Sequence, residues 1–302
     1  MAHSQLDDVK PTFITYPTGS CREEASVLAV LETPRENGPA VVVTDVSPFH
    51  PLDPLWPDQP ADHGELTSGE RVFRVSDTVT VARRPGGPVM VGNEVDARRD
   101  EPDVLFVVGQ VVDAAAAEFL APGTRVTLAV DEARRLRLSA AHTACHLLAY
   151  ALNEATHGLW RKETGADSRG HHDFDAATCV LTRHDEGGSL DRYRLGKSLR
   201  KRGFDVARFL DELPGIVERT NGTLAHWITT DAPVRVDCLG PRLTDRRQWV
   251  CETPGGTAQM PCGGTHVERL GQIASMTAQA SYDADDGILT IRNEVRTHRA
   301  AR

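Results

Sequence analysis

The sequence predicts an α+β protein in which a β-barrel-like N-terminal domain, residues 1–132, precedes an α+β domain, residues 133–302. Short β-rich runs separated by Pro, Gly and Asp clusters fill the first part of the chain. Near residue 131 the apolar pattern changes from a strand period to a helical period. The chain has 302 residues, of which 40% are hydrophobic, and this is enough to form two cores.

The β-rich runs have the length of strands in a small antiparallel barrel or sandwich. Turn-forming residues separate them at regular intervals. The five runs are SVLAVLE (26–32), AVVVTDV (40–46), RVFRVSDTVTVARR (71–84), DVLFVVGQVV (103–112) and GTRVTLAVD (123–131).

The segment 131–158 predicts a long helix, because its apolar residues recur at helical spacing. Ser139 is a suitable N-cap residue, and Gly158 is expected to end the helix. A second helix is expected at 205–220, with Pro214 as a break point. Further strands are expected at 177–184, 232–239 and 288–295.

The formal net charge of −9 comes from the first part of the chain. Residues 1–132 carry 10 basic and 22 acidic side chains, whereas residues 133–302 carry 24 basic and 21 acidic side chains. The densest basic run is DRYRLGKSLRKR, residues 191–202. Such a run is either a solvated face or a surface that binds nucleic-acid phosphates. The second interpretation assigns tRNA contacts to Arg194, Lys197, Arg200, Lys201 and Arg202.

The six cysteines are scattered without the short spacings of a disulfide framework, which favours a reducing compartment. The first residues lack a basic segment followed by an apolar run, and no apolar stretch is long enough to span a bilayer. We therefore expect a cytoplasmic protein without a membrane contact. Its oligomeric state does not follow from the sequence.

Two pairs of metal-ligating residues stand far apart in the chain. His142 and His146 are one helical turn apart and therefore lie on the same face of the predicted helix. Cys262 and His266 enclose two glycines, which are expected to let the backbone bend so that both side chains face inward. Either pair alone is more often structural than ligating. Together they predict one metal site.

The predicted donor set consists of three imidazole nitrogens and one thiolate. This set suits tetrahedral Zn²⁺ far better than Mg²⁺ or Ca²⁺, which prefer oxygen ligands. Thr143, rather than a glutamate, follows His142, so the site lacks the general base of the HExxH metalloproteases. A different hydrolytic chemistry is therefore expected.

The motifs resemble those of a known family. RRLRLSAAHTACHLLAYAL (134–152) and MPCGGTHVERLGQI (260–273) look like the two metal-binding motifs of the alanyl-tRNA synthetase editing domain and its free-standing relatives, the AlaX-type trans-editing proteins. HHDFD (171–175) is similar to the family's R-x-D-F segment, and LPGIVERTNGTLAHWI (213–228) to the helix before its later strands. PFHPLDPLWPDQPADHGEL (48–66) stands where the family has its glycine-rich G-G-G-Q-P-x-D-x-G loop.

The resemblance implies hydrolysis of the ester that joins a wrong amino acid to the terminal ribose of a tRNA, with Zn²⁺ as cofactor and tRNA as partner. A separate proofreader is needed where a synthetase pocket cannot reject a near-isostere by binding alone. No catalytic synthetase domain is recognisable, so we expect an enzyme that acts in trans. We expect catalytic roles for Thr143, Asp173 and Thr265. Substrate contacts are expected from Gln59, Asp62, His171, Gly263 and Gly264.

The sequence also departs from the family pattern. Gln59 and Asp62 keep the end of the glycine loop, but Trp-Pro-Asp at 56–58 replaces its glycine triplet, and His171 replaces the family's arginine. These changes leave the cargo open. A small β-hydroxy amino acid is expected, either as seryl-tRNA(Ala) or as a threonine analogue such as fluorothreonyl-tRNA, which one branch of the family deacylates.

Two other functions are compatible with the sequence. A non-catalytic tRNA-binding module is favoured by the four-ligand count, since a closed tetrahedral site normally marks a structural zinc. A zinc hydrolase of a small-molecule ester or amide is favoured by the acidic first part of the chain and by the lost glycine triplet.

Overall fold

The computed structural model describes residues 6, 9–32, 38–55 and 57–298. It contains helices together with largely antiparallel sheets, which confirms the α+β class. The chain divides into two compact units. Unit 1 comprises residues up to 135 with 238–247 and 263–265, and unit 2 comprises 136–237, 248–262 and the residues from 266 onward.

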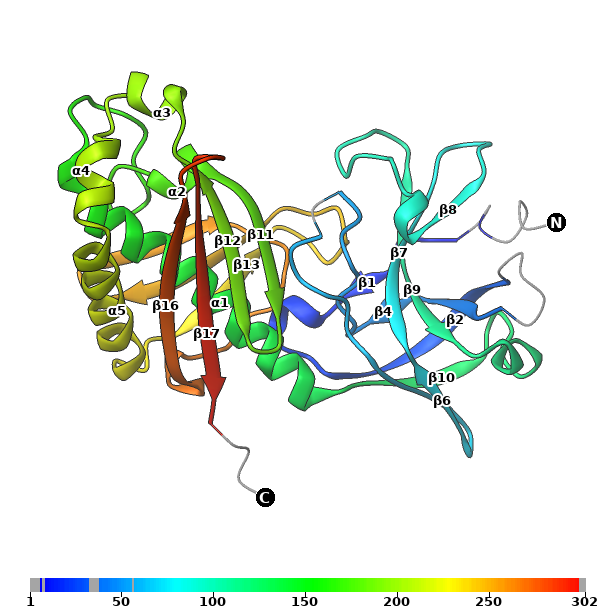
Figure 1. The fold of residues 1–302 in the computed structure, drawn as a ribbon. Helices are drawn as coiled ribbons and strands as arrows, with labels where there is room; N and C mark the ends of the chain where they lie inside the picture. Colours follow the sequence, from blue (N-terminus) through cyan, green and yellow to red (C-terminus); the bar gives the residue numbers. More distant parts are fainter. Residues whose placement is uncertain (1–5, 7–8, 33–37, 56, 299–302) are drawn as a thin grey trace. The chain divides into compact units, whose positions relative to one another are not determined.

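Unit 1 is built around an eight-stranded antiparallel sheet with the strand order β6-β5-β10-β2-β3-β9-β7-β8 (Figure 1). Two short strands, β1 (Phe13–Ile14) and β4 (Val46–Ser47), pair in parallel beside it. The sheet strands are β2 (Arg22–Glu32), β3 (Ala40–Thr44), β5 (Gly64–Ser68), β6 (Arg71–Val75), β7 (Asp77–Arg83), β8 (Val89–Val91), β9 (Leu105–Val112) and β10 (Arg125–Val130). All five predicted β-rich runs therefore form strands.

The sheet of unit 1 is open, and the predicted barrel-like closure is not found. Its edge strands, β6 and β8, are not paired with each other within the part of the chain that the structure describes. The central strand β2 pairs with β10 up to Ser26 and with β3 from Val27 onward, with a bulge between Val27 and Ala29. A bulge of this kind sharpens the local twist and bends the strand.

The helix α1 (Glu132–Thr156) lies within the predicted segment 131–158, but it begins seven residues before Ser139, so the assignment of Ser139 as its N-cap is wrong. Asp131 caps it instead, because its Oδ1 accepts a hydrogen bond of 3.0 Å from the backbone N–H of Arg134. The middle of α1 is rich in alanine and leucine and is buried on nearly every side. A helix that is apolar all round belongs inside a core, and this places its histidines in the interior.

Unit 2 contains a four-stranded antiparallel sheet with the order β11-β12-β17-β16 and a three-stranded sheet with the order β13-β14-β15. Helix α5 (Leu213–Thr229) packs along β16, as Figure 1 shows. Asn221 fixes this contact, because its amide donates to the Ala278 carbonyl (3.0 Å) and accepts from the Ala278 N–H (2.7 Å). The strands are β11 (Cys179–Asp185), β12 (Gly188–Arg194), β13 (Val234–Cys238), β14 (Arg247–Thr253), β15 (Gly256–Pro261), β16 (Ile273–Asp283) and β17 (Ile288–Thr297).

The helical segments of unit 2 follow local sequence signals. The helix predicted at 205–220 is interrupted, as expected, just before Pro214: α4 (Val206–Asp211) ends and α5 begins with Pro214 in its first turn. The short helix α2 (Phe174–Thr178) follows Asp173, and α3 (Lys197–Lys201) follows β12. Among the described residues, none of the helices has the length and apolar character needed to cross a membrane.

Candidate metal centre

Four predicted ligands meet inside unit 2. His142 and His146 lie on α1, Cys262 directly follows β15, and His266 lies in the loop before the 3-10 turn Leu270–Gln272. The Sγ of Cys262 is 3.4 Å from Nε2 of His142 and 3.2 Å from Nε2 of His266. All four donor atoms lie within 4.8 Å of one another. The structure thus brings together residues about 120 positions apart in the sequence, as the motif spacing predicts.

The two sulfur-to-nitrogen distances are close to those around a tetrahedral zinc ion. Zinc bonds of about 2.3 Å to sulfur and 2.0–2.1 Å to nitrogen imply sulfur-to-nitrogen distances of about 3.5 Å. The Nε2 atom of His146 is buried, and no described residue forms a hydrogen bond with it. A buried polar atom without a partner is costly, and a bound cation would satisfy it. The residues therefore fit a metal ion.

Burial keeps one of the four predicted ligands, His146, neutral. His142 is almost fully buried, with a relative exposure of 1%. Burial, followed by the nearby charge of His184, lowers the pKa of His146 to about 3. The neutral imidazole is the form that binds a metal, so His146 can bind a cation at neutral pH.

Thr143 contacts the donor set through the far side of His266. Its Oγ1 lies 3.1 Å from Nδ1 of His266 and accepts a hydrogen bond of 3.2 Å from the backbone N–H of Val267. Because Nδ1 is engaged with the hydroxyl, Nε2 of the ring faces Cys262. Partners of this kind fix the orientation and the tautomer of a ligating histidine. Thr143 is thus a positioning residue, and its predicted catalytic role stays a prediction.

Two neighbours of the cluster were not predicted from the sequence. His184 on β11 is buried, and its ring centroid lies 4.4 Å from that of His142. Trp249 on β14 is fully buried, and its ring lies 5.0 Å from that of His146. Each is a single residue on a strand, without a motif that could have marked it. His184 therefore packs against the ring of His142, and Trp249 against the ring of His146.

The residues predicted to bind substrate in the first half belong to unit 1. Gln59 forms two hydrogen bonds with Thr265: Nε2 donates to Oγ1 (2.8 Å), and Oε1 accepts from the backbone N–H (3.0 Å). Asp62 forms a buried ion pair with Arg135, whose Nε donates to Oδ1 at 3.0 Å, and accepts from the N–H of His50 at 2.6 Å. These contacts organise the loop, and substrate binding by Gln59 and Asp62 stays a prediction. Trp56 lies outside the described residues.

The two glycines of CGGTH do not adopt the left-handed conformation that only glycine accepts readily, since neither has a positive φ. At Gly263 the missing side chain matters instead. A Cβ there would lie 3.3 Å from Nη1 of Arg99 and 3.4 Å from Nη2 of Arg247, within unit 1. Glycine at this position therefore makes room for two guanidinium groups. The expected contacts of Gly263, Gly264 and Thr265 with substrate or in catalysis stay predictions.

The segment that resembles R-x-D-F lies just before α2. Asp173 is the N-cap of this helix, since its Oδ1 accepts from the N–H of Ala176 (2.9 Å), and it also accepts from Nδ2 of Asn153 (3.2 Å). The N–H of His171 donates to Oδ1 of Asp167 (3.0 Å). Both predicted residues thus help to shape the loop before α2, and their catalytic and substrate-binding roles stay predictions.

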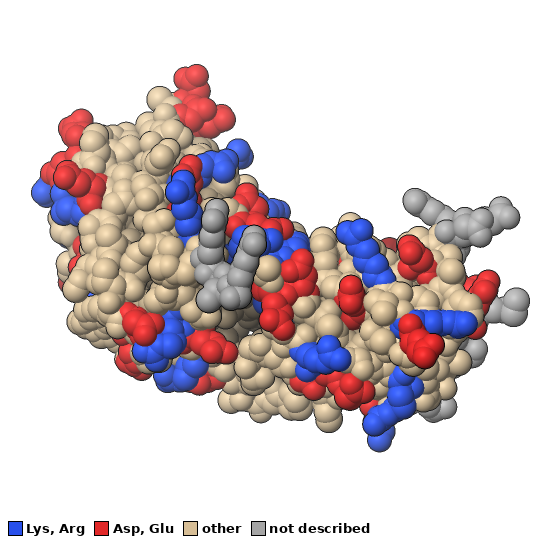
Figure 2. Space-filling model, turned by 90° about the horizontal axis from the view of Figure 1, so that it is seen from below, with Lys and Arg blue, Asp and Glu red and all other residues tan. Residues whose placement is uncertain are grey.

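The basic run 191–202 divides between two elements. Its first half is the end of β12, and its second half is α3 with the residue that follows it. All five predicted tRNA-contact residues are exposed: Arg194, Lys197, Arg200, Lys201 and Arg202. On the face of the molecule that Figure 2 shows, basic and acidic side chains are interspersed, so this face offers no uniformly basic surface.

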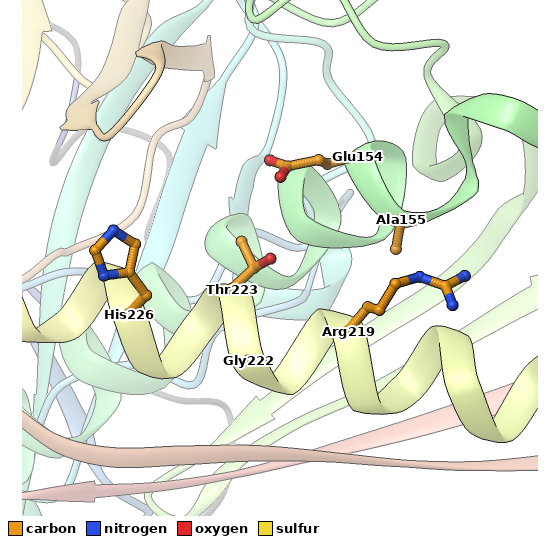
Figure 3. Close-up of a pocket in the computed structure, with 6 residues that line it drawn as sticks. All are labelled: Glu154, Ala155, Arg219, Gly222, Thr223 and His226. Carbon is orange, nitrogen blue, oxygen red and sulfur yellow. The ribbon is translucent and has the colours of Figure 1, made fainter.

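A shallow cavity of about 500 Å³ lies between α1 and α5 (Figure 3). Glu154 reaches into it from α1, and Arg219, Thr223 and His226 do so from α5. Glu154 is paired with Arg169 at 2.8 Å. None of the four clustered ligands lines this cavity.

No known family model matches the chain. The chain is similar to the protein named alanine–tRNA ligase in several organisms. It is 28% identical to that of Halorubrum lacusprofundi over 289 residues, which is 89% of this chain and 24% of the relative. The Anaeromyxobacter sp. protein is 31% identical over 210 residues (68% and 20%), and the Ruegeria pomeroyi protein is 28% identical over 308 residues (96% and 29%). The chain spans about a quarter of the length of these curated relatives. It is therefore related to one part of alanine–tRNA ligase.

Proposed function

We propose that the chain is a zinc-dependent hydrolase that acts in trans. It removes a wrongly attached small β-hydroxy amino acid from a tRNA that a separate enzyme has charged. The substrate would be seryl-tRNA(Ala) or a threonine analogue such as fluorothreonyl-tRNA. The reaction adds water to the ester carbonyl and breaks its bond to the ribose oxygen. It releases the free amino acid and the uncharged tRNA.

The convergence of the four donor atoms is the observation that carries this proposal. The ligand atoms of four residues all lie within 4.8 Å of one another, and these residues are His142, His146, Cys262 and His266. An N₃S donor set in the interior of a unit is typical of zinc. The similarity to one part of alanine–tRNA ligase supports tRNA as the class of substrate.

When bound, zinc would supply a Lewis acid that polarises an ester carbonyl or holds a polar group of the substrate. The chain's own residues prepare for this. Burial keeps His146 neutral, and Thr143 aims His266 at the thiol of Cys262. Trp249 and His184 cover the imidazoles with aromatic surface, which limits the access of water to them.

The basic run provides the tRNA contact in this proposal. Arg194, Lys197, Arg200, Lys201 and Arg202 are exposed and belong to the half of the chain with a positive net charge. Neutralising phosphates with such side chains gives affinity that falls with salt. The protein as a whole is acidic, so we expect this contact to be local and the affinity to be modest.

The deciding experiment adds the purified, zinc-loaded protein to a panel of tRNAs that were charged beforehand. The panel contains seryl-, glycyl-, alanyl-, threonyl- and fluorothreonyl-esters, and loss of the ester is followed over time. We expect hydrolysis of at least one β-hydroxy aminoacyl ester and little hydrolysis of alanyl-tRNA(Ala). Hydrolysis of simple carboxylic esters, with every tRNA ester left intact, would point to a small-molecule hydrolase instead.

A non-catalytic tRNA-binding module is the second candidate, and the donor count favours it. Four protein donors close a tetrahedral site, whereas a catalytic zinc usually keeps one position for water or substrate. Binding of tRNA without loss of any ester in the panel would select this function.

A further inference from the structure

Three aromatic rings form a row in the segment that links α1 to α2. The ring centroids of Trp160 and His172 are 5.5 Å apart. Those of His172 and His157 are 4.7 Å apart, with an interplanar angle of 19°. The backbone N–H of His172 donates to Nδ1 of His157 at 3.2 Å, and Nδ1 of His172 lies 3.1 Å from Oγ1 of Thr164. The loop itself therefore holds His157 and His172 in a stack, with the ring of Trp160 tilted by 41° against that of His172.

The row ends at an exposed ring. His157 is exposed, whereas Trp160 and His172 are partly buried. Phe204 packs against Trp160 from the core side, with the two ring centroids 5.0 Å apart. Because the inner rings are supported by the core, a further flat ring would extend the row at the exposed His157, whose ring also makes an edge-on contact with that of His171 (centroids 5.5 Å apart).

Positive charge lies directly beside the row. The N–H of Arg161 donates to the Gly203 carbonyl (2.9 Å), and Nζ of Lys162 donates to the Lys201 carbonyl (3.1 Å). These contacts join the segment after Trp160 to the end of α3, where residues 200–202 are all basic. Neither 157–162 nor 196–203 contains an acidic residue, but Arg161 is paired with Asp205 just beyond the second segment. The aromatic row and the basic run therefore belong to one surface.

Gly203 makes this arrangement possible. It has a φ of +99°, and a Cβ at this position would lie 2.8 Å from Cγ of Lys162. Any other residue would be strained in this conformation and would also push the lysine away. The side chain of Lys162 therefore packs directly over Gly203.

We infer that the His157 row, together with Lys162, Lys201 and Arg202, is a binding platform for unpaired RNA nucleotides, with one base stacked on His157 and adjacent phosphates held by the cations. Sequence-tolerant recognition of single strands combines aromatic faces with a basic track in this way. Bases within a duplex are already stacked and cannot do so. The inference rests on the proposed function, in which the unpaired 3′ end of a tRNA supplies these nucleotides.

The test measures binding apart from catalysis. Fluorescence anisotropy would follow a short labelled single-stranded RNA, and the same sequence annealed into a blunt duplex, with the zinc-loaded protein. The wild-type protein should bind the single strand more tightly. His157→Ala should weaken single-strand binding about fivefold or more and leave duplex binding unchanged, because loss of one stacked base costs this much. Lys201→Glu should weaken binding of both the single strand and the duplex. It should also reduce the slope of log affinity against log salt concentration by about one.

Matched variants separate stacking from general damage. His157→Phe keeps a flat face without ring nitrogens and should bind within about twofold of the wild type. His226→Ala and Arg219→Glu change an exposed histidine and an exposed cation on α5, and should leave single-strand binding unchanged. Thermal unfolding of each variant shows that the fold is retained.

Two results would overturn the inference. One is a His157→Ala variant that folds normally and binds single-stranded RNA like the wild type. The other is a wild-type protein without preference for the single strand over the duplex. If the platform binds as described but no mischarged tRNA loses its ester, the proposed function fails while the platform stands. If deacylation occurs but His157→Ala has no effect on binding, only the platform fails.

Discussion

The hydroxyl of Thr143 lies 3.1 Å from Nδ1 of His266, while Nε2 of the same ring lies 3.2 Å from the sulfur of Cys262. One helix residue therefore sets the orientation of a ligand that comes from a loop more than 120 residues later. A metal ion bound at Nε2 requires the proton to be on Nδ1, and Thr143 can accept that proton in a hydrogen bond. Thr143 and the four predicted ligands therefore act together as one site.

Replacing Thr143 with valine should weaken zinc binding by about 10- to 100-fold, which is the usual effect of losing a hydrogen-bond partner of a ligating histidine. Valine keeps the shape of threonine but cannot accept the hydrogen bond. Competition with a chromogenic chelator would measure the zinc affinity. Thr143→Ser, which restores the hydroxyl, should recover most of the loss. Equal affinity in the valine variant and the wild type would show that the contact is only packing.

The purified protein should carry about one zinc ion per chain, and His142→Ala or Cys262→Ala should lose it, because removal of one donor destroys the tetrahedral set. Elemental analysis of dialysed protein checks this. His226→Ala, which removes an exposed histidine on α5, is the control and should retain the metal. Full deacylase activity in a protein free of zinc would refute the metal assignment.

Reversing Arg200, Lys201 and Arg202 to glutamate should raise KM for tRNA and flatten its dependence on salt, with little change in kcat. These exposed side chains would otherwise displace counterions from phosphates. Initial rates of deacylation at several salt concentrations give both quantities. Arg219→Glu serves as a charge control on another exposed helix position. If KM and the salt slope stay the same, the run is only a solvated face.

A partly buried carboxyl makes stability depend on pH. Burial, and then the negative charges of Asp191 and Asp173, raise the pKa of Asp175 to about 7. The folded chain therefore holds a proton here, between about pH 4 and pH 7, that the unfolded chain releases. The free energy of unfolding should fall as the pH rises through this interval.

The corresponding variant, Asp175→Asn, is neutral at every pH and should remove this part of the pH dependence. Its Tm should exceed that of the wild type by ~2 °C or more at pH 8 and approach it at pH 5. Comparison at each pH cancels contributions from the metal ligands, which both proteins share. Asp185→Asn changes an exposed carboxyl of β11 and should show no such trend. Parallel Tm curves for Asp175→Asn and the wild type would contradict the assignment.

The sequence predicts the centre of the site better than its surroundings. His142 and His146 are recognisable because helical spacing alone puts them on one face of the helix. Cys262 and His266 are recognisable because the two glycines between them are expected to let the backbone bend, so that both side chains face inward. Neither signal depends on knowing the fold. The same local reasoning places the break before Pro214 correctly.

Contacts that span the chain could not be predicted. Gln59 and Thr265 are 206 residues apart, and no local pattern indicates that a glutamine amide will bind a threonine so distant in sequence. His184 is a single histidine on a strand, and nothing in the local sequence indicates that it lies beside the predicted metal ligands. The local sequence favours Ser139 as the N-cap of α1, because Asp131, the observed cap, lies at the end of a strand-like run. In each case long-range packing, rather than local preference, decides the outcome.

The amide of Asn221, which holds α5 to β16, is followed in the chain by Gly222. Asparagine before glycine is chemically fragile, since the unhindered glycine nitrogen can attack the side-chain carbonyl and expel ammonia. In the folded protein the helix and both hydrogen bonds to Ala278 keep the amide away from that reaction. Once deamidated, the side chain would set a carboxylate oxygen against the Ala278 carbonyl, and the contact would weaken. Ageing of stored protein should therefore begin in molecules where α5 has transiently separated from β16. Water then opens the cyclic imide, and the isoaspartate or aspartate that results would mark the chains in which this separation took place.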